Sequence, residues 1–187
     1  SVVFYRIGVV MLVNLSEVMS NVGQRKDAQV PIGLEQFTMY GETYAFSEKE
    51  DAKISVVCIG ERKISLTCKA KVCLEIPCSR CLKMVQVPFE IDFEKEFDFS
   101  GQKEEARIEL EETEYIQEYS LDVDTLITEE MMLQFPMQTL CSDNCKGICD
   151  ICGTNLNTGS CNCDQQGRDP RMLAIQDIFK NFGQTDN

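Results

Sequence analysis

The sequence predicts an α+β protein in which a small antiparallel sheet is followed by a cysteine-rich C-terminal module and a closing helix. Residues 63–76 and 85–99 alternate apolar and polar side chains, as strands with one buried face do. Six cysteines lie between Cys141 and Cys163, and a helical stripe of apolar residues follows them. The length of 187 residues, 43% of them hydrophobic, allows a core domain and a small stapled one.

We expect the core domain over residues 11–136 and the cysteine-rich module with its helix over residues 137–187. Residues 1–10 are unusually apolar before Met11, which suggests a non-native extension. Residues 15–20 are expected to be helical, and residues 30–37 to form an edge strand.

The two alternating runs predict a long antiparallel hairpin whose turn spans residues 77–84. The strand at 54–59 would precede it and the segment 115–119 would follow, giving a meander of three or four strands. Lysines occupy the outward face of the first run and carboxylates that of the second, so the charges are placed for cross-strand pairing.

Two further helices are expected. The first covers residues 125–134, with Asp124 as its cap and Pro136 preventing its continuation. The second begins at Asp169-Pro170, where proline is favoured at the first helical position, and ends at Gly183. Its buried stripe consists of Met172, Ile175, Phe179 and Phe182.

The cysteine spacing predicts a metal site. The chain has no histidine, so sulfur must provide the ligands. Cys149 and Cys152 can occupy two corners of a tetrahedron, because Gly153 allows the tight turn behind them. Cys161 and Cys163 can fill the other two corners. A four-thiolate shell is typical of structural zinc, so we predict bound Zn²⁺ and a zinc module.

A second CxxC, Cys78 and Cys81, lies in the hairpin turn. It could be a redox pair, half of a zinc site, or two packed thiols. A redox pair normally lies at a helix N-terminus, whereas this one lies between strands. If it is a half-site, Cys141 and Cys145 are the natural partners, and eight cysteines would form two sites.

Composition limits the function further. The segment from Glu90 to Glu130 holds 16 of the 31 acidic residues and three basic ones, which accounts for the whole net charge of −13. This charge disfavours direct RNA or DNA binding. Within the segment, Glu104, Glu105, Glu111 and Glu112 are candidate partner-binding residues, although a solvated acidic surface is the alternative.

The sequence offers no template for catalysis. Without histidine there is no Ser-His or Cys-His pair, and no phosphate-binding glycine loop is present. We therefore predict a protein that is not an enzyme. The cysteines indicate metal rather than disulfides, and no apolar stretch reaches the roughly 20 residues of a membrane span, so the expected location is the cytoplasm.

Several motifs resemble those of the YceD-like family of bacterial and plastid proteins linked to large-subunit ribosomal RNA accumulation. They are the opening M-L-V-N-L-S-E-V from Met11, the turn P-C-S-R-C-L from Pro77, the run C-K-G-I-C-D-I-C-G-T-N-L-N from Cys145, and D-P-R from Asp169. The resemblance implies a non-enzymatic role in ribosome biogenesis, in a family whose genes tend to lie beside one for a large-subunit ribosomal protein. Some members lack the C-terminal cysteines, which makes the metal a stabilising device.

The functional expectation is a cytosolic factor for accumulation or maturation of large-subunit (23S) ribosomal RNA. Its acidic segment would bind a basic large-subunit ribosomal protein or a pre-ribosomal particle. One alternative is nucleic-acid binding through the zinc module, which is weakened because residues 141–164 contain one basic residue, Lys146. The other is thiol redox or metal-trafficking activity through the CxxC pairs.

Overall fold

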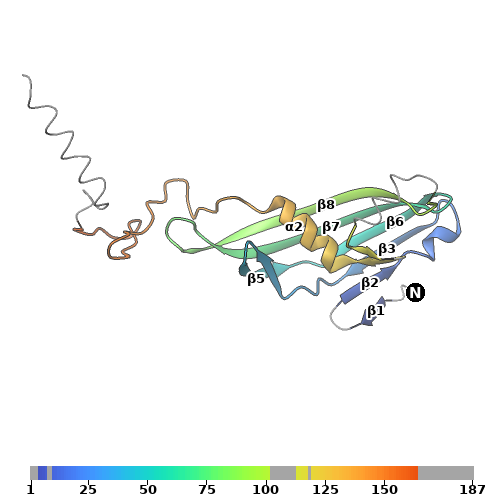
Figure 1. Cartoon of the computed structure of the whole chain (residues 1–187), viewed down its shortest axis with the longest axis horizontal. Helices are drawn as coiled ribbons and strands as arrows, with labels where there is room; N and C mark the ends of the chain where they lie inside the picture. The colour runs from blue at the N-terminus through green and yellow to red at the C-terminus, as the bar shows by residue number, and fades with distance from the viewer. Residues whose placement is uncertain (1–3, 8–9, 102–112, 118, 164–187) are drawn as a thin grey trace, which may run out of the picture. The chain divides into compact units, whose positions relative to one another are not determined.

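The computed structural model describes residues 4–7, 10–101, 113–117 and 119–163. The chain divides into two compact units, Ser1–Cys141 and Ser142–Asn187. Within the described residues, every strand and the one α-helix belong to the first unit (Figure 1). The predicted antiparallel sheet core is confirmed. The helix predicted to begin at Asp169-Pro170 lies outside the described residues.

The described residues form two sheets, and the larger one is organised around one long strand, β7 (Lys63–Pro77). One edge of β7 pairs along its whole length with β8 (Met84–Asp98). Its other edge pairs first with β6 (Ala52–Gly60) and then with β5 (Glu42–Lys49). Beyond these lie β3 (Arg25–Val30), next to β6, and β4 (Gln36–Met39), next to β5.

The predicted hairpin is confirmed in its strands, its turn and its burial. The two strands pair from Lys63 with Asp98 to Pro77 with Met84, without a register shift. Every second side chain of β7 is buried in the core, as the alternation predicted. These residues are Ile64, Leu66, Cys68, Ala70, Val72, Leu74 and Ile76.

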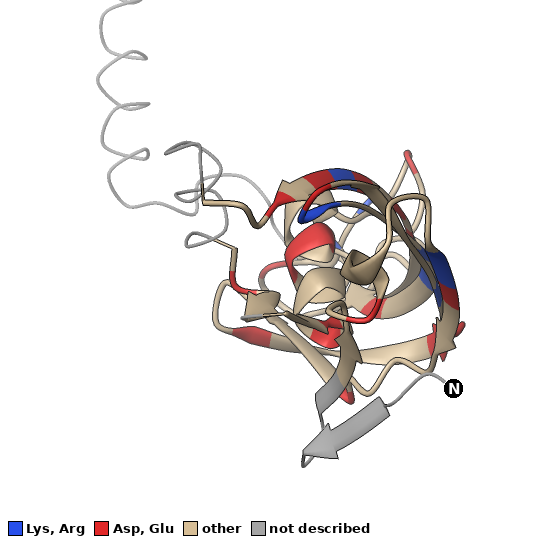
Figure 2. Cartoon of the chain, turned by 90° about the vertical axis from the view of Figure 1, so that its right-hand side faces the viewer, with Lys and Arg blue, Asp and Glu red and all other residues tan. Residues whose placement is uncertain are grey.

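The opposite face of the hairpin carries the expected charge pairs. The Lys63 ammonium lies 3.0 Å from the carboxylate of Asp98, Lys69 lies 3.0 Å from Asp92, and Lys71 lies 2.7 Å from Glu90. Figure 2 shows basic and acidic segments side by side on this outer surface. The side chains of the Lys69 and Lys71 pairs are mostly exposed, so these pairs contribute little to stability.

The segment predicted at 115–119 forms a strand, but not in the sheet of the hairpin. It contributes β9 (Ile116–Gln117), which pairs with β10 (Ser120–Asp122) in a smaller sheet with β2 (Val10–Asn14) and β1 (Phe4–Ile7). Aromatic packing explains the difference. Tyr115 contacts the rings of Phe93 and Phe97 edge-on, at 5.8 and 6.2 Å between centroids, so the chain crosses the sheet instead of extending it.

Helix α2 (Val123–Gln134) lies on the concave side of the curved strands (Figure 2) and buries Leu126, Ile127 and Met131 completely. Its end before Pro136 agrees with the prediction. The predicted cap is wrong by two residues, because the carboxylate that accepts the first N–H groups belongs to Asp122, not Asp124.

Asp124 instead has a tertiary contact. Its Oδ1 accepts the N–H of Gly33 at 2.9 Å, in a segment that was wrongly predicted as part of an edge strand over 30–37. Strand β3 ends at Val30 and β4 begins at Gln36. Pro31 lacks an N–H and interrupts the pairing.

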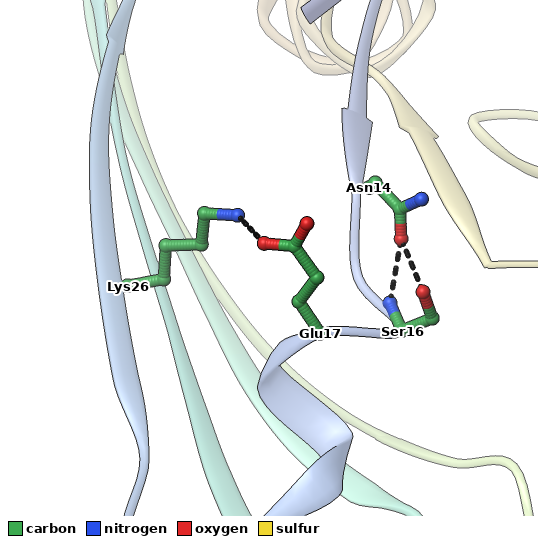
Figure 3. A network of polar contacts seen from close by, with 4 residues as sticks. All are labelled: Asn14, Ser16, Glu17 and Lys26. Atoms are coloured by element: carbon green, nitrogen blue, oxygen red, sulfur yellow. Dashed lines mark hydrogen bonds and ion pairs between the residues drawn. The ribbon is translucent and has the colours of Figure 1, made fainter. Parts of the chain in front are cut away.

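The N-L-S-E motif near the N-terminus has a structural explanation. The Oδ1 of Asn14 accepts both the N–H and the hydroxyl of Ser16, at 2.9 and 2.6 Å (Figure 3). The carboxylate of Glu17 lies 2.6 Å from the ammonium of Lys26 on β3, and the hydrogen bond from Lys26 lowers the pKa of Glu17. Leu15 and Val18 are fully buried between these contacts. Of the predicted helix over 15–20, only the 3-10 turn η1 (Val18–Ser20) forms.

Candidate metal centres

The first cysteine cluster begins at the tight turn that joins β7 to β8. The N–H of Cys78 donates to the carbonyl of Lys83 at 2.8 Å, and the N–H of Leu82 donates to the carbonyl of Cys78 at 2.9 Å. Leu82 has a left-handed backbone, with φ of 60°, which a bulky residue rarely adopts. Cys78 and Cys81 are both buried.

The segment that follows α2 returns to this turn. The N–H of Ser79 donates to the carbonyl of Thr139 at 2.8 Å, and the N–H of Thr139 donates to the hydroxyl of Ser79 at 3.3 Å. These bonds place Cys141 beside the CxxC: its N–H lies 3.4 Å from the sulfur of Cys78, and its own sulfur lies 3.5 Å from that of Cys81. Cys145 completes the group, whose four sulfur atoms all lie within 4.8 Å of one another.

The second cluster consists of Cys149, Cys152, Cys161 and Cys163, whose sulfur atoms also lie within 4.8 Å of one another. The N–H of Gly153 donates to the carbonyl of Cys149 at 2.7 Å. Gly153 has φ of 73°, which glycine adopts without strain. The turn therefore has the tight shape expected for Cys-x-x-Cys-Gly.

The donors in both clusters fit a tetrahedral metal. A Zn–S bond of about 2.3 Å corresponds to a separation of about 3.8 Å between sulfur atoms at the corners of a tetrahedron. Both groups of sulfur atoms lie within the 4.8 Å limit, and small rotations about the Cα–Cβ bonds would adjust the spacing. All donors are thiols, which suit zinc and other soft-ligand metals. Each cluster could therefore bind one metal ion.

Hydrogen bonds prepare one thiol in each cluster for ionisation. Burial opposes ionisation of Cys78, but the N–H groups of Arg80, Cys81 and Cys141 donate toward its sulfur and lower its pKa to about 6. The hydroxyl and N–H of Thr154 lower the pKa of Cys152 to about 6. The thiolate is the form that binds metal, so these contacts favour metal binding.

Polar side chains around the clusters were not identified from the sequence. The amide Nδ2 of Asn157 lies 3.4 Å from the sulfur of Cys145, and its Oδ1 accepts the N–H of Lys146 at 2.8 Å. The Thr154 hydroxyl lies 3.1 Å from the sulfur of Cys152. The feature of the sequence that could have indicated them is the abundance of Asn and Thr between the cysteines, because such side chains form local hydrogen bonds.

The three remaining cysteines, Cys58, Cys68 and Cys73, are strand residues and free thiols. Burial raises the pKa of Cys68 to about 12. Its sulfur therefore stays protonated and packs as a small hydrophobic group, as expected for a residue on the apolar face of β7.

The four glutamates proposed for partner binding, Glu104, Glu105, Glu111 and Glu112, lie outside the described residues. The described part of the acidic segment is concentrated on β8, which carries Glu90, Asp92, Glu94, Glu96 and Asp98 at alternate positions. Among the described residues, no helix is long and apolar enough to cross a membrane.

Comparisons with known proteins agree with the motifs. Residues 66–179 match the family model described as "Large ribosomal RNA subunit accumulation protein YceD". The chain is 30% identical over 106 residues to "Uncharacterized protein YlbN" of Bacillus subtilis (strain 168). This alignment covers 56% of this chain and 60% of that protein. It is 36% identical over 64 residues to "Large ribosomal RNA subunit accumulation protein YCED homolog 1, chloroplastic" of Zea mays. This second alignment covers 32% of this chain and 20% of that protein.

No solved structure matches the chain. The chain spans about three fifths of the length of the Bacillus subtilis relative and one fifth of that of the maize relative. The family match, however, extends over more than half of the chain and includes β8, α2 and both cysteine clusters. The protein belongs to the YceD family.

Proposed function

We propose that this protein is a non-enzymatic factor that supports accumulation or maturation of large-subunit (23S) ribosomal RNA in the cytoplasm. The observation that carries the proposal is the family match over residues 66–179. The family is named for an effect on ribosomal RNA, and the maize relative has the same description. Neither name refers to a reaction.

The proposed metal is Zn²⁺, with a structural role. Eight cysteines lie in two groups of four, and each group could supply a tetrahedral shell. A shell closed by four protein ligands leaves no position for substrate or water, which is the arrangement of structural rather than catalytic zinc. One site would consist of Cys149, Cys152, Cys161 and Cys163, and the other of Cys78, Cys81, Cys141 and Cys145.

The proposed partner is a basic large-subunit ribosomal protein, alone or in a pre-ribosomal particle. The net charge of −13 repels the phosphates of RNA and attracts a basic protein. The acidic segment from Glu90 to Glu130, including Glu104, Glu105, Glu111 and Glu112, would hold such a protein until it meets RNA. Direct RNA binding would be weak or absent.

Affinity purification from cells at low salt tests this function. A large-subunit ribosomal protein should be enriched with the tagged chain, and its recovery should fall as salt screens the charges. Deleting the gene should lower 23S relative to 16S ribosomal RNA. Normal ratios in the deletion strain, with no ribosomal protein enriched, would contradict the proposal.

A further inference from the structure

Strand β8 has one edge that no other described strand covers. It pairs over 15 residues with β7, and no strand among the described residues pairs with its other side. Figure 1 shows β8 as the outermost strand of this sheet. An unpaired edge presents N–H and C=O groups that can accept an additional strand.

The direction of the free backbone groups follows from the hydrogen bonds of β7. The carbonyl of Lys71 accepts the N–H of Glu50 at 2.9 Å, on the side away from β8. A residue in an antiparallel sheet directs its N–H and C=O to the same side. Lys71 therefore makes no backbone bond to its partner Glu90, and the backbone groups of Glu90 point to the unpaired edge.

Because the register is continuous, the same orientation recurs at every second residue of β8. The backbone groups of the residues in between, at odd-numbered positions, point toward β7. The 2.8 Å bond from the N–H of Phe99 to the carbonyl of Arg62, just beyond the end of β8, belongs to this series. Pro88 belongs to the outward set, where its missing N–H costs no bond to β7. Between residues 90 and 98, the backbone groups that no described strand pairs with thus belong to Glu90, Asp92, Glu94, Glu96 and Asp98.

The residues with free backbone groups are also the residues with carboxylates. Glu94 and Glu96 lie opposite Thr67 and Ser65, and no ion pair within the described part of the chain neutralises them. Glu90 and Asp92 are each paired with a lysine whose side chain is 61% exposed, so water and other cations can compete for these two carboxylates. Asp98 is already paired with Lys63. The edge is therefore lined by negative charge on one face.

This charge pattern selects the kind of strand that can be added. A second copy of β8 would place carboxylates opposite carboxylates, which is unfavourable. A strand with lysine or arginine at every second position would instead place a cation beside each carboxylate. Nine residues would cover the edge from Glu90 to Asp98, a length of about 30 Å.

We propose that the free edge of β8 binds an extended basic polypeptide segment as an additional antiparallel strand. This inference rests on the proposed function, since it identifies how the basic partner is held. Backbone hydrogen bonds provide the affinity, and the alternating carboxylates provide the preference for alternating cations. The site is formed by described residues and does not require Glu104, Glu105, Glu111 or Glu112.

The test uses the full-length, metal-replete protein and two synthetic nine-residue peptides of the same composition. One alternates lysine with threonine, and the other has its five lysines in a row. The alternating peptide should bind more tightly and slow hydrogen exchange at the amides of Glu90, Asp92, Glu94, Glu96 and Asp98. The double variant Glu94→Gln with Glu96→Gln should weaken binding by about three- to tenfold.

A proline variant separates strand addition from simple charge attraction. Glu94→Pro removes a free N–H and should weaken binding more than tenfold, well beyond Glu94→Gln. Gln86→Pro is the matched control, because it has the same orientation outside the acidic run. If both peptides bind equally and Glu94→Pro behaves like Glu94→Gln, strand addition is wrong. Co-purification of a ribosomal protein is a separate readout, so the proposed function can survive that result.

Discussion

Replacing Asp122 with alanine should destabilise the sheet unit measurably. The Asp122 carboxylate accepts the N–H groups of Asp124 and Thr125 at 3.1 and 3.2 Å, and the hydroxyl of Thr125 at 2.8 Å. Loss of a cap costs about 1 kcal/mol, and loss of a negative charge at a helix N-terminus costs roughly 0.3–1 kcal/mol more. Relief of repulsion with Asp124 offsets part of this, so we expect a loss of about 1.5 kcal/mol.

The loss should appear in global unfolding and not only as local fraying. Leu126, Ile127 and Met131 have no exposed surface, so the helix cannot detach without opening the core. Urea unfolding can be followed by far-UV circular dichroism and tyrosine fluorescence, since the chain has no tryptophan. Asp122→Asn keeps an acceptor oxygen and should lose less than about 0.5 kcal/mol. A value for Asp122→Ala within about 0.3 kcal/mol of the wild type, at unchanged m-value, would refute the assignment of the cap.

Three further outcomes are expected. Protein purified without chelator should contain one or two equivalents of zinc by elemental analysis, and less than about half an equivalent would contradict the zinc sites. The variant Cys152→Ser should lose one equivalent. Its amide hydrogen exchange should be faster after Cys141 but unchanged in the β7–β8 hairpin. Leu66→Ala should lower the unfolding free energy by about 2–5 kcal/mol in urea titrations, because the side chain is fully buried, and a loss below 1 kcal/mol would argue against this core. Burial raises the pKa of Asp124 above its ordinary value, so the folded state keeps this proton at a pH where the unfolded chain has lost it. The contribution of Asp124 to stability should therefore fall as pH rises from about 4 through its folded-state pKa. The difference in unfolding free energy between the wild type and Asp124→Asn, measured across this pH range, should show that fall.

The sequence was most informative where a pattern repeats over many residues. The alternation in residues 63–76 and 85–99 specified the hairpin, its turn and its buried face, because a period of two has one meaning over such a length. The cysteine spacing likewise grouped the eight thiols that the structure brings together. Both signals are local, or nearly so.

Errors arose where a contact distant in sequence decides the outcome. Asp122 and Asp124 are both reasonable caps in the sequence, and the burial of Asp124 against Gly33 decides between them. The strand at Ile116–Gln117 joins the smaller sheet because Tyr115 packs on Phe93, a pairing that no local pattern contains. The polar side chain of Asn157 reaches a cysteine 12 residues away, and the abundance of asparagines between the cysteines does not single it out.

The pairing of β7 on both edges has a consequence for how its length can vary. A single residue inserted between Lys63 and Pro77 would turn every side chain on one side of the insertion to the opposite face. The apolar row from Ile64 to Ile76 would then meet water, or its ladder with β8 would break. The same insertion would also move Cys78 away from Cys141, whose N–H lies 3.4 Å from its sulfur. Variation in length should therefore be confined to loops outside this strand. In related proteins that have the two cysteines of the hairpin turn, the number of residues between the start of β7 and the first of these cysteines should be the same.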